Sequence, residues 1–490
     1  MREAGLLQPV ASLPSKFGIG DFGPSAYEFV DLAAKAGVKI WQILPLNPLG
    51  FGNSPYQPYS SKAFDEIYIS LERLQERGLI KTELKEYNPL ADRIDYDGAR
   101  KFKLPYLKEA FKTYFAENRR GYKKWRSENE WVYNYAVFRA LKANNYEQLW
   151  TAWPKEQKLW IKNGKFDITP FKDDIEFTMW LQFVAYKQWM ALRTYANEAG
   201  IKIMGDIPFY VGIDSDDVWT NQEAFKLDDE GNATFVAGVP PDYFSKTGQR
   251  WGNPIYDWEY LTKTNYAFWV DRLAYNAKLY DIIRIDHFRA FNDYYEIPAS
   301  SATAEVGEWV DGPGEKFFDV ILKEIKDIEI VAEDLGDLTP GVLELRDKYN
   351  FKGMKIGQFS FNPADEKKHL WDEEDRENLI IYTGTHDNET IRGWWENQSP
   401  DFKQAAVRFL AELGYHPKND VIDNFLLLTF DSIADLAIIP TQDLLRLGNE
   451  ARINTPGSIG SPNWEWKLSS FTPLIDRLGF LTLLIRRSNR

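Results

Sequence analysis

Four acidic residues each end an apolar run that has the composition of a buried strand. They are Asp206, Asp286, Glu333 and Asp387. A carboxylate in such a place is costly to bury unless it is paired or used in chemistry. Four carboxylates placed alike predict one shared site at the carboxyl ends of the strands of a parallel barrel, where barrel enzymes carry out their chemistry. Paired carboxylates in that site are what cleavage of a glycosidic bond requires.

Arg284 and Asp286 lie two residues apart on one predicted strand. The two-residue period of a strand places both side chains on the same face, here the interior of the barrel. A guanidinium favours the ionised form of a neighbouring carboxylate, and an ionised carboxylate can act as a nucleophile. The alternative is a structural ion pair in the core, and the three similar carboxylates elsewhere favour a functional role.

Glu333 ends the next predicted strand. A general acid must stay protonated near neutral pH, which requires burial or a neighbouring like charge. A position close to Asp286 at the end of an apolar strand supplies both. The adjacent Asp334 points the opposite way in a strand, so we expect it to be structural. Asp206 precedes Ile-Pro, and proline stops a strand; we expect Asp206 to support the site or to contact sugar hydroxyls, with the capping of a turn as the alternative.

Two of the four histidines, His287 and His386, adjoin candidate carboxylates. The alternative to a role in binding is a histidine satisfied within the core. His and Asp side chains also bind zinc, which raises a metal-dependent hydrolase as a further alternative. The chain contains neither the H-x-H nor the H-E-x-x-H spacing that would support it. We therefore expect neither a metal nor another cofactor.

Eight strand candidates alternate with helical patterns along most of the chain. They fall near residues 5–10, 39–44, 202–207, 282–286, 328–333, 354–359, 379–383 and 436–440. The helical pattern from Pro24 to Ala36 has proline in its first turn and Gly37 after its end, which are typical start and stop signals. Alternating strands and helices predict right-handed crossovers and a parallel sheet. The predicted fold is α/β, a (β/α)8 TIM barrel with inserted helical and loop-rich subdomains.

The uneven spacing of these strands predicts two insertions. We expect residues 1–65 to form the first two β/α units and residues 66–174 to form an inserted, mainly helical subdomain. Residues 175–490 would complete the barrel, with a second, loop-rich insertion at about 211–264 over the active site. Long loops with little regular structure are usually functional.

Composition narrows the class of protein. The chain has 490 residues, a net charge of -14 and no cysteine. The missing cysteines exclude disulfides, thiol catalysis and cysteine metal sites. The negative charge argues against nucleic acid and against anionic membrane surfaces as partners. With neither a signal-like segment nor an apolar run of membrane-spanning length, a cytoplasmic protein with a neutral substrate is expected.

Several motifs resemble those of known enzymes. IRIDHFR at 283–289, VAEDLG at 331–336 and TGTHDN at 383–388 look like the motifs of the fourth, fifth and seventh strands in the α-amylase clan. NSPYQPYS at 53–60, GDIPFYV at 205–211, PPDYFS at 240–245 and GQRWGNPIY at 248–256 are similar to glycoside hydrolase family 77, the 4-α-glucanotransferases. The likeness covers essentially the whole chain. The Ile-Pro pair after Asp206 replaces the Asn-His of plain amylases, which disfavours their usual calcium site.

The resemblance implies a retaining, metal-independent transferase that moves α-1,4-glucan segments from a donor to the 4-hydroxyl of an acceptor through a covalent glucosyl-enzyme. Its partners would be α-1,4-glucans and maltooligosaccharides, with glucose as an acceptor. Asp286 would be the nucleophile, Glu333 the acid/base and Asp387 the stabiliser of the transition state. The implied substrate-binding residues are Ser54, Tyr56, Asp206, Asp242, Tyr243, Trp251, Asn253, Arg284, His287 and His386. The alternatives are an α-1,4-glucan hydrolase on the same site and a non-catalytic glucan-binding barrel.

Overall fold

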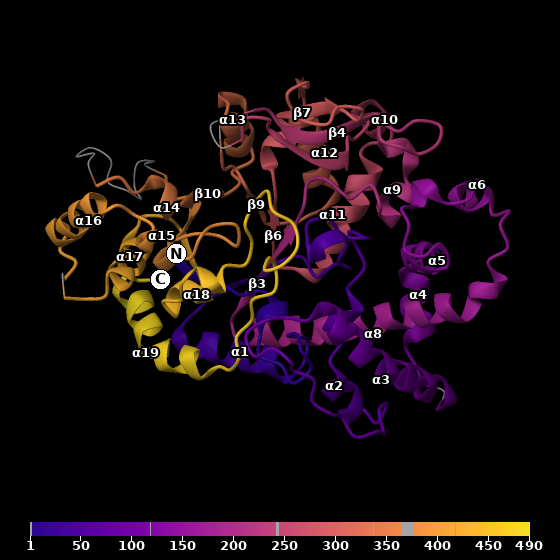
Figure 1. The fold of residues 1–490 in the computed structure, drawn as a ribbon, viewed down its shortest axis with the longest axis horizontal. Coiled ribbons are helices and arrows are strands. Elements are labelled where there is room, and N and C mark those ends of the chain that lie inside the picture. The colour runs from indigo at the N-terminus through magenta and orange to yellow at the C-terminus, as the bar shows by residue number, and fades with distance from the viewer. Residues whose placement is uncertain (1, 118, 242–244, 337, 364–375, 417) are drawn as a thin grey trace.

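A parallel sheet of eight strands forms the centre of the molecule (Figure 1). The computed structural model describes residues 2–117, 119–241, 245–336, 338–363, 376–416 and 418–490. The strands are β1 (Glu3–Leu7), β2 (Ile40–Gln42), β3 (Lys202–Ile207), β6 (Ile282–Ile285), β9 (Ile330–Ala332), β10 (Gly353–Ile356), β11 (Leu379–Tyr382) and β12 (Leu436–Pro440). Their order in the sheet is β10-β11-β12-β1-β2-β3-β6-β9, and all neighbours are parallel.

The two outer strands of this order meet and close the sheet. A parallel bridge joins Val331 to Lys352, and the Ala332 N–H donates to the Lys352 carbonyl at 2.8 Å. The predicted (β/α)8 barrel is therefore confirmed. The first strand lies earlier than expected, at Glu3–Leu7, because Pro9 has no N–H to donate and a 3-10 turn at Val10–Ser12 follows it.

The helix predicted at Pro24–Ala36 is confirmed as α1, which ends at Gly37 with a φ of 97°. It packs against α8 and α19. The main helices of the barrel units are α1, α8 (Lys172–Glu198), α11 (Ala267–Leu279), α12 (Gly314–Glu324), α13 (Pro340–Lys348), α14 (Gly357–Ser360), α15 (Ile391–Glu396), α16 (Pro400–Glu412), α17 (Val421–Asp431), α18 (Thr441–Leu444) and α19 (Thr472–Arg487). Their buried faces and the barrel strands share one continuous apolar core.

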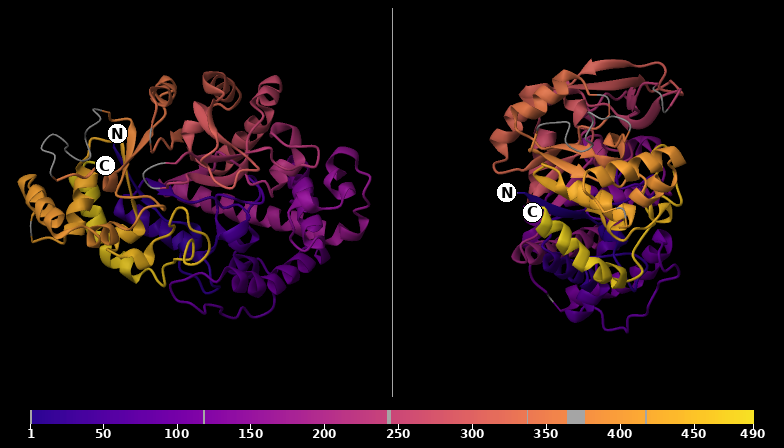
Figure 2. Two further views of the ribbon diagram at one scale, coloured as in Figure 1. Left: turned by 45° about the horizontal axis from the view of Figure 1, so that its top comes forward. Right: turned by 90° about the vertical axis from the view of Figure 1, so that its left-hand side faces the viewer.

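Residues 66–174 are mainly helical in their described part. These helices are α2 (Leu71–Glu76), α3 (Tyr96–Ala116), α4 (Tyr122–Glu128), α5 (Trp131–Asn144), α6 (Lys155–Lys158) and α7 (Trp160–Asn163). Helices α3, α4 and α5 pack on α8. Figures 1 and 2 show this group on one side of the barrel and α16, α17 and α19 on the other. The division of the chain at residues 65 and 174 stays a prediction.

A second sheet stands beside the barrel, and sequence analysis did not anticipate it. It contains the antiparallel strands β5 (Gln249–Pro254), β4 (Phe235–Val239), β7 (Asp293–Pro298) and β8 (Glu308–Asp311), in that order. Two strands come from the segment expected to be rich in loops, and two follow β6. The first of these segments also contains α9 (Asp216–Thr220) and α10 (Trp258–Lys263). Because β7 follows β6 after one short 3-10 helix at Phe288–Phe291, this sheet is attached directly to the chain that carries Asp286.

Candidate active site

The four acidic residues lie at the carboxyl ends of four barrel strands. Asp206 is the last residue but one of β3, Asp286 follows β6, Glu333 follows β9, and Asp387 lies in the loop after β11. The strands are parallel, so these ends all point to the same end of the barrel. Strands β3, β6 and β9 are direct neighbours, which places the first three carboxylates side by side.

Arg284 connects two of these carboxylates. Its Nη1 donates to both carboxylate oxygens of Asp206 at 2.7 Å, and its Nη2 lies 3.0 Å from Asp286 Oδ1. The Arg284 side chain is 3% exposed. Burial alone would lower the pKa of Arg284, but the carboxylates of Asp206 and Asp286 hold it well above its ordinary value. A permanent cation therefore lies beside Asp286.

Asp286 and Glu333 differ in their surroundings and in their acidity. Burial raises the pKa of Asp286 to about 6, against the opposing charge of Arg284. Burial and the charge of Asp286 together raise the pKa of Glu333 to about 7. Glu333 is also oriented by the backbone, because Oε2 accepts the His287 N–H at 2.7 Å and Oε1 accepts the Leu335 N–H at 3.2 Å. Between these two pKa values, Asp286 is mostly ionised and Glu333 is mostly protonated.

His287 presents its N–H to Glu333 from a left-handed backbone, with a φ of 54°. Burial lowers the pKa of His287 to about 4, so its ring is neutral at neutral pH. The ring stands edge-on to Trp251 of β5, with centroids 5.0 Å apart. Trp251 of the second sheet therefore contacts His287, the residue whose N–H orients the acid/base candidate Glu333.

Asp387 is held by His386 on one oxygen and by Asn454 on the other. His386 Nε2 lies 3.3 Å from Oδ2, and Asn454 Nδ2 donates to Oδ1 at 2.6 Å. Burial would raise the pKa of Asp387, but His386 and Asn454 lower it to about 2. For His386, burial by itself would lower the pKa, but the charge of Asp387 raises it above its usual value. Asp387 is thus an ionised carboxylate with a fixed orientation.

Tyr56 stacks on His386, with ring centroids 5.0 Å apart and an interplanar angle of 14°. Its hydroxyl donates to Asp206 Oδ2 at 2.7 Å, and its N–H donates to Ser54 Oγ at 3.3 Å. Burial raises the pKa of Tyr56 well above its usual value, which keeps the hydroxyl protonated. Tyr56 therefore connects Asp206 of β3 with His386, which lies in the loop after β11.

Two more of the predicted residues, Trp251 and Asn253, lie on β5. Trp251 is partly exposed, and its indole N–H donates to Gln249 Oε1 at 3.2 Å. Asn253 is buried and donates to the Val211 carbonyl at 3.0 Å, which ties β5 to the chain after β3. Asp242 and Tyr243 lie outside the described residues.

Asp334 lies apart from these groups, as the alternation along its strand predicts. It pairs with Arg346, and its Oδ1 accepts the Met354 N–H at 2.7 Å. Asp334 therefore anchors β10 and α13, which is the structural role expected from the sequence.

Three residues of the site come from the chain after β12 and were not predicted from the sequence. They are Asn454, Arg452, whose Nη2 donates to the Asp387 carbonyl at 2.8 Å, and Trp464, whose ring lies 5.8 Å from that of Tyr56. The one signal for them is a long irregular stretch between α18 and α19, because loops of this length are usually functional.

The described residues contain neither a candidate metal-binding cluster nor a membrane-spanning helix. No group of three or more His, Asp or Glu side chains among them has an arrangement that could hold a metal ion. In the same residues, every helix is too short or too polar to span a bilayer.

Comparison with known proteins places this site in one family. The sequence profile described as 4-alpha-glucanotransferase matches residues 8–472. The 4-alpha-glucanotransferase of Synechocystis sp. is 42% identical over 477 residues, covering 95% of this chain and 94% of that protein. The 4-alpha-glucanotransferase of Thermus thermophilus is 40% identical over 481 residues, covering 95% of each.

A solved structure agrees with these matches. The amylomaltase from Streptococcus agalactiae in complex with acarbose has a TM-score of 0.94 and 35% identity, and the match covers 100% of both chains. The amylomaltase from Corynebacterium glutamicum is 17% identical with a TM-score of 0.77 over 100% of this chain and 75% of that one, which indicates a shared fold. The resemblance seen in the motifs is confirmed, and the chain belongs to the 4-alpha-glucanotransferases of glycoside hydrolase family 77.

Proposed function

We propose that this glucanotransferase moves α-1,4-glucan segments from a donor glucan to the 4-hydroxyl of an acceptor glucan or glucose, through a covalent glucosyl-enzyme on Asp286. The observation that carries this proposal is the contrast between Asp286 and Glu333. Arg284, 3.0 Å from Asp286, opposes the burial that raises the pKa of Asp286 to about 6, whereas burial and the charge of Asp286 raise the pKa of Glu333 to about 7. One carboxylate is suited to attack, and the other is suited to donate a proton.

In the first half of the reaction, Glu333 protonates the glycosidic oxygen while Asp286 attacks the anomeric carbon. The bond to the leaving chain breaks as the bond to Asp286 forms. The His287 N–H, 2.7 Å from Glu333 Oε2, fixes the direction in which the carboxyl points. Arg284 stabilises Asp286 in the ionised form needed for attack.

In the second half, Glu333 is a base and takes the proton from the 4-hydroxyl of the acceptor. The acceptor oxygen displaces Asp286, and two inversions retain the α configuration. Asp387, held by His386 and Asn454, binds ring hydroxyls and favours the flattened ring of the transition state. A retaining mechanism predicts that the carboxyls of Asp286 and Glu333 lie ~5–5.5 Å apart in a substrate complex.

The surrounding residues support roles in substrate binding. Tyr56 offers an aromatic face beside His386, and Trp251 borders the site from β5. Asp206 is buried and engaged with Arg284 and Tyr56, which supports the positioning of those two side chains rather than direct contact with sugar. A cytoplasmic location stays a prediction of the sequence.

Incubation with maltotriose alone tests the proposal. Transfer yields glucose together with a ladder of longer maltooligosaccharides, whereas a hydrolase on the same site yields shorter sugars only. A non-catalytic glucan-binding barrel leaves maltotriose unchanged. Adding isotopically labelled glucose tests its role as an acceptor, because transfer of a maltosyl unit from maltotriose to glucose gives labelled maltotriose, and further rounds place the label in longer products. A parallel reaction with a chelator should proceed at the same rate.

A further inference from the structure

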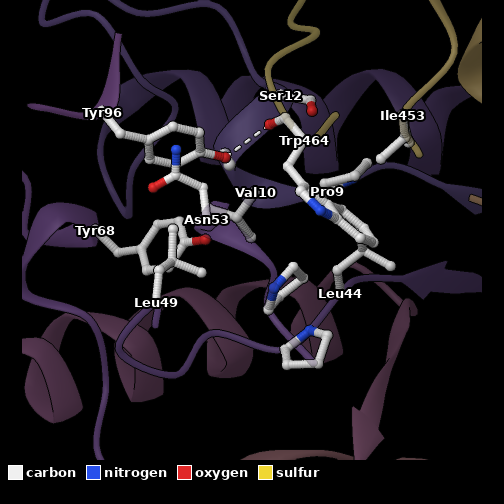
Figure 3. A pocket seen from close by; sticks show the side chains of 13 residues that line it. Pro9, Val10, Ser12, Leu44, Leu49, Asn53, Tyr68, Tyr96, Ile453 and Trp464 are labelled. Atoms are coloured by element: carbon white, nitrogen blue, oxygen red, sulfur yellow. Dashed lines mark hydrogen bonds between the residues drawn. The ribbon is translucent and has the colours of Figure 1, made fainter. Parts of the chain in front are cut away.

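The segment between α18 and α19 connects the catalytic residues to the helical region of residues 66–174. On the catalytic side, Asn454 Nδ2 donates to Asp387 Oδ1 at 2.6 Å and the Asn454 N–H donates to the His386 carbonyl at 3.1 Å. On the helical side, the Tyr96 hydroxyl at the start of α3 donates to the Trp464 carbonyl at 2.7 Å. Figure 3 shows this bond between Tyr96 and Trp464 beside a pocket that both residues line.

Trp464 has an unusual backbone. Its φ is 67°, a left-handed conformation that is a genuine outlier for a bulky side chain. Two hydrogen bonds fix it, because the Trp464 N–H donates to the Ile453 carbonyl at 2.6 Å and the carbonyl accepts from Tyr96. Residues held in such conformations cluster at functional sites, where the surrounding structure over-determines them.

The Trp464 indole packs behind two residues of the site. Its ring lies 5.8 Å from Tyr56 and 5.9 Å from His386. These two rings stack on each other, and the Tyr56 hydroxyl also donates to Asp206. Trp464 is 9% exposed, so it supports the stack from within the protein rather than offering a face to substrate.

Trp464 also lines a small pocket. The pocket is lined mainly by apolar side chains, among them Pro9, Leu44 and Ile453, together with Asn53 (Figure 3). The hydrogen bond from the Tyr96 hydroxyl to the Trp464 carbonyl holds the backbone that carries the indole beside this pocket.

We propose that Trp464 is a positioning residue for glucan transfer, which holds the Tyr56–His386 stack in place and is itself held by the hydroxyl of Tyr96. The inference rests on the proposed function, since the stack borders the carboxylates that carry out the transfer. The competing explanation is core packing, which accounts for most buried tryptophans. Core packing alone requires neither a left-handed backbone nor a contact with two residues of the active site.

Four variants of the full chain separate these explanations. Trp464→Leu removes the indole, Trp464→Phe keeps an aromatic ring, and Tyr96→Phe removes only the hydroxyl. The control is Trp153→Leu, which removes a buried indole whose ring neighbours are Phe138 of α5 and Trp219 of α9. For each variant we would measure kcat and KM for maltotriose per folded molecule, with the folded fraction taken from thermal unfolding. With only four histidines in the chain, NMR on histidine-labelled protein follows the titration of His386.

Displacing catalytic groups by about 1 Å lowers rates by up to ~100-fold. We therefore expect Trp464→Leu to lower kcat by between about 10- and 100-fold with a smaller change in KM. Trp464→Phe should recover part of the loss, and Tyr96→Phe should lower kcat less than Trp464→Leu. The pKa of His386 should fall in Trp464→Leu, because the contact with Asp387 that raises it is loosened. Trp153→Leu should lose stability but keep its kcat.

An unchanged kcat and an unchanged His386 titration in Trp464→Leu would overturn the proposal. So would an equal loss of kcat in Trp153→Leu, since that indicates a general effect of lost packing. Should Trp464→Leu fail to fold, Trp464→Phe and Tyr96→Phe decide by the same two measurements. A wild-type protein that makes no ladder from maltotriose refutes the proposed function instead, and the His386 titration still tests the position of Trp464.

Discussion

Asp206 and Arg284 face each other as register partners on the adjacent strands β3 and β6. Both carboxylate oxygens of Asp206 accept from Arg284 Nη1 at 2.7 Å, and the two side chains are 0% and 3% exposed. Arg284 is thereby shared between a buried carboxylate and Asp286. Because Asp206 offsets part of its charge, Arg284 does not prevent burial from raising the pKa of Asp286 to about 6.

Replacing Arg284 with methionine should destabilise the fold. The change leaves Asp206 buried without its cation, and breaking a buried pair in this way costs about 3–5 kcal/mol. The free energy of unfolding, measured in urea, reports the loss. The double variant Arg284→Met/Asp206→Asn is the control, because it removes the unpaired charge and should recover part of the loss. A single variant as stable as the wild type would show that the pair does not stabilise the barrel.

The rate of transfer should show a bell-shaped dependence on pH, with apparent pKa values near 6 and 7. Below the pKa of Asp286, at about 6, the nucleophile is protonated and the rate falls. Above the pKa of Glu333, at about 7, the proton donor is lost and the rate falls again. The two groups interact, so the two apparent pKa values of the profile describe the pair rather than either residue alone. The profile of kcat/KM for maltotriose from pH 4 to 9 checks this, and a flat profile would contradict it.

Asn454→Ala should impair turnover more than binding. The variant removes the 2.6 Å hydrogen bond to Asp387 Oδ1, so the carboxylate is oriented by His386 alone and its pKa rises. We expect kcat to fall by about 10-fold, the cost of roughly one hydrogen bond to a charged group. Asn454→Asp is the matched comparison, since it sets a second negative charge against Asp387 and should lower kcat further. Wild-type kcat in both variants would exclude Asn454 from the site.

Asp286→Asn should reduce turnover by roughly 10⁴-fold, which is typical of removing a residue that acts within a catalytic group. The amide matches the carboxylate in shape but is a poor nucleophile, so folding should be unaffected. Thermal unfolding and the rate of glucose release from maltotriose are the two measurements. Asp319→Asn, which alters an exposed carboxylate on α12, is the control and should keep full activity. Activity near wild type in Asp286→Asn would remove Asp286 from the mechanism.

The barrel could be predicted because its signals are local. Continuous apolar runs mark strands that are covered by helices, and the run at Leu436–Pro440 became β12 with the expected bounds. Proline at the start and glycine at the end fixed α1 in the same way. The carboxylates were found because a charge at the end of such a run is costly without a partner.

The second sheet and the contact of Asn454 with Asp387 could not be predicted, because both depend on pairing between residues that are distant in sequence. Strand β8 (Glu308–Asp311) is mostly exposed and has no apolar alternation, so it becomes a strand only by pairing with β7. Asn454 contacts Asp387 across 67 residues of chain, and nothing near Asn454 in the sequence indicates that contact. The pairing of Asp206 with Arg284 likewise depends on the register between β3 and β6.

The central claim is that Asp286 forms a covalent bond to the transferred sugar, and trapping that intermediate tests it most directly. Glu333→Gln would be incubated with α-maltotriosyl fluoride. Fluoride leaves without being protonated, so the covalent adduct still forms. The variant lacks the base that activates an acceptor, so the adduct accumulates. Mass spectrometry of the digested protein then locates the added sugar. We predict a maltotriosyl adduct on the peptide that contains Asp286 and none in Asp286→Asn/Glu333→Gln. An adduct on another carboxylate, or full consumption of the donor without any adduct, would contradict the account.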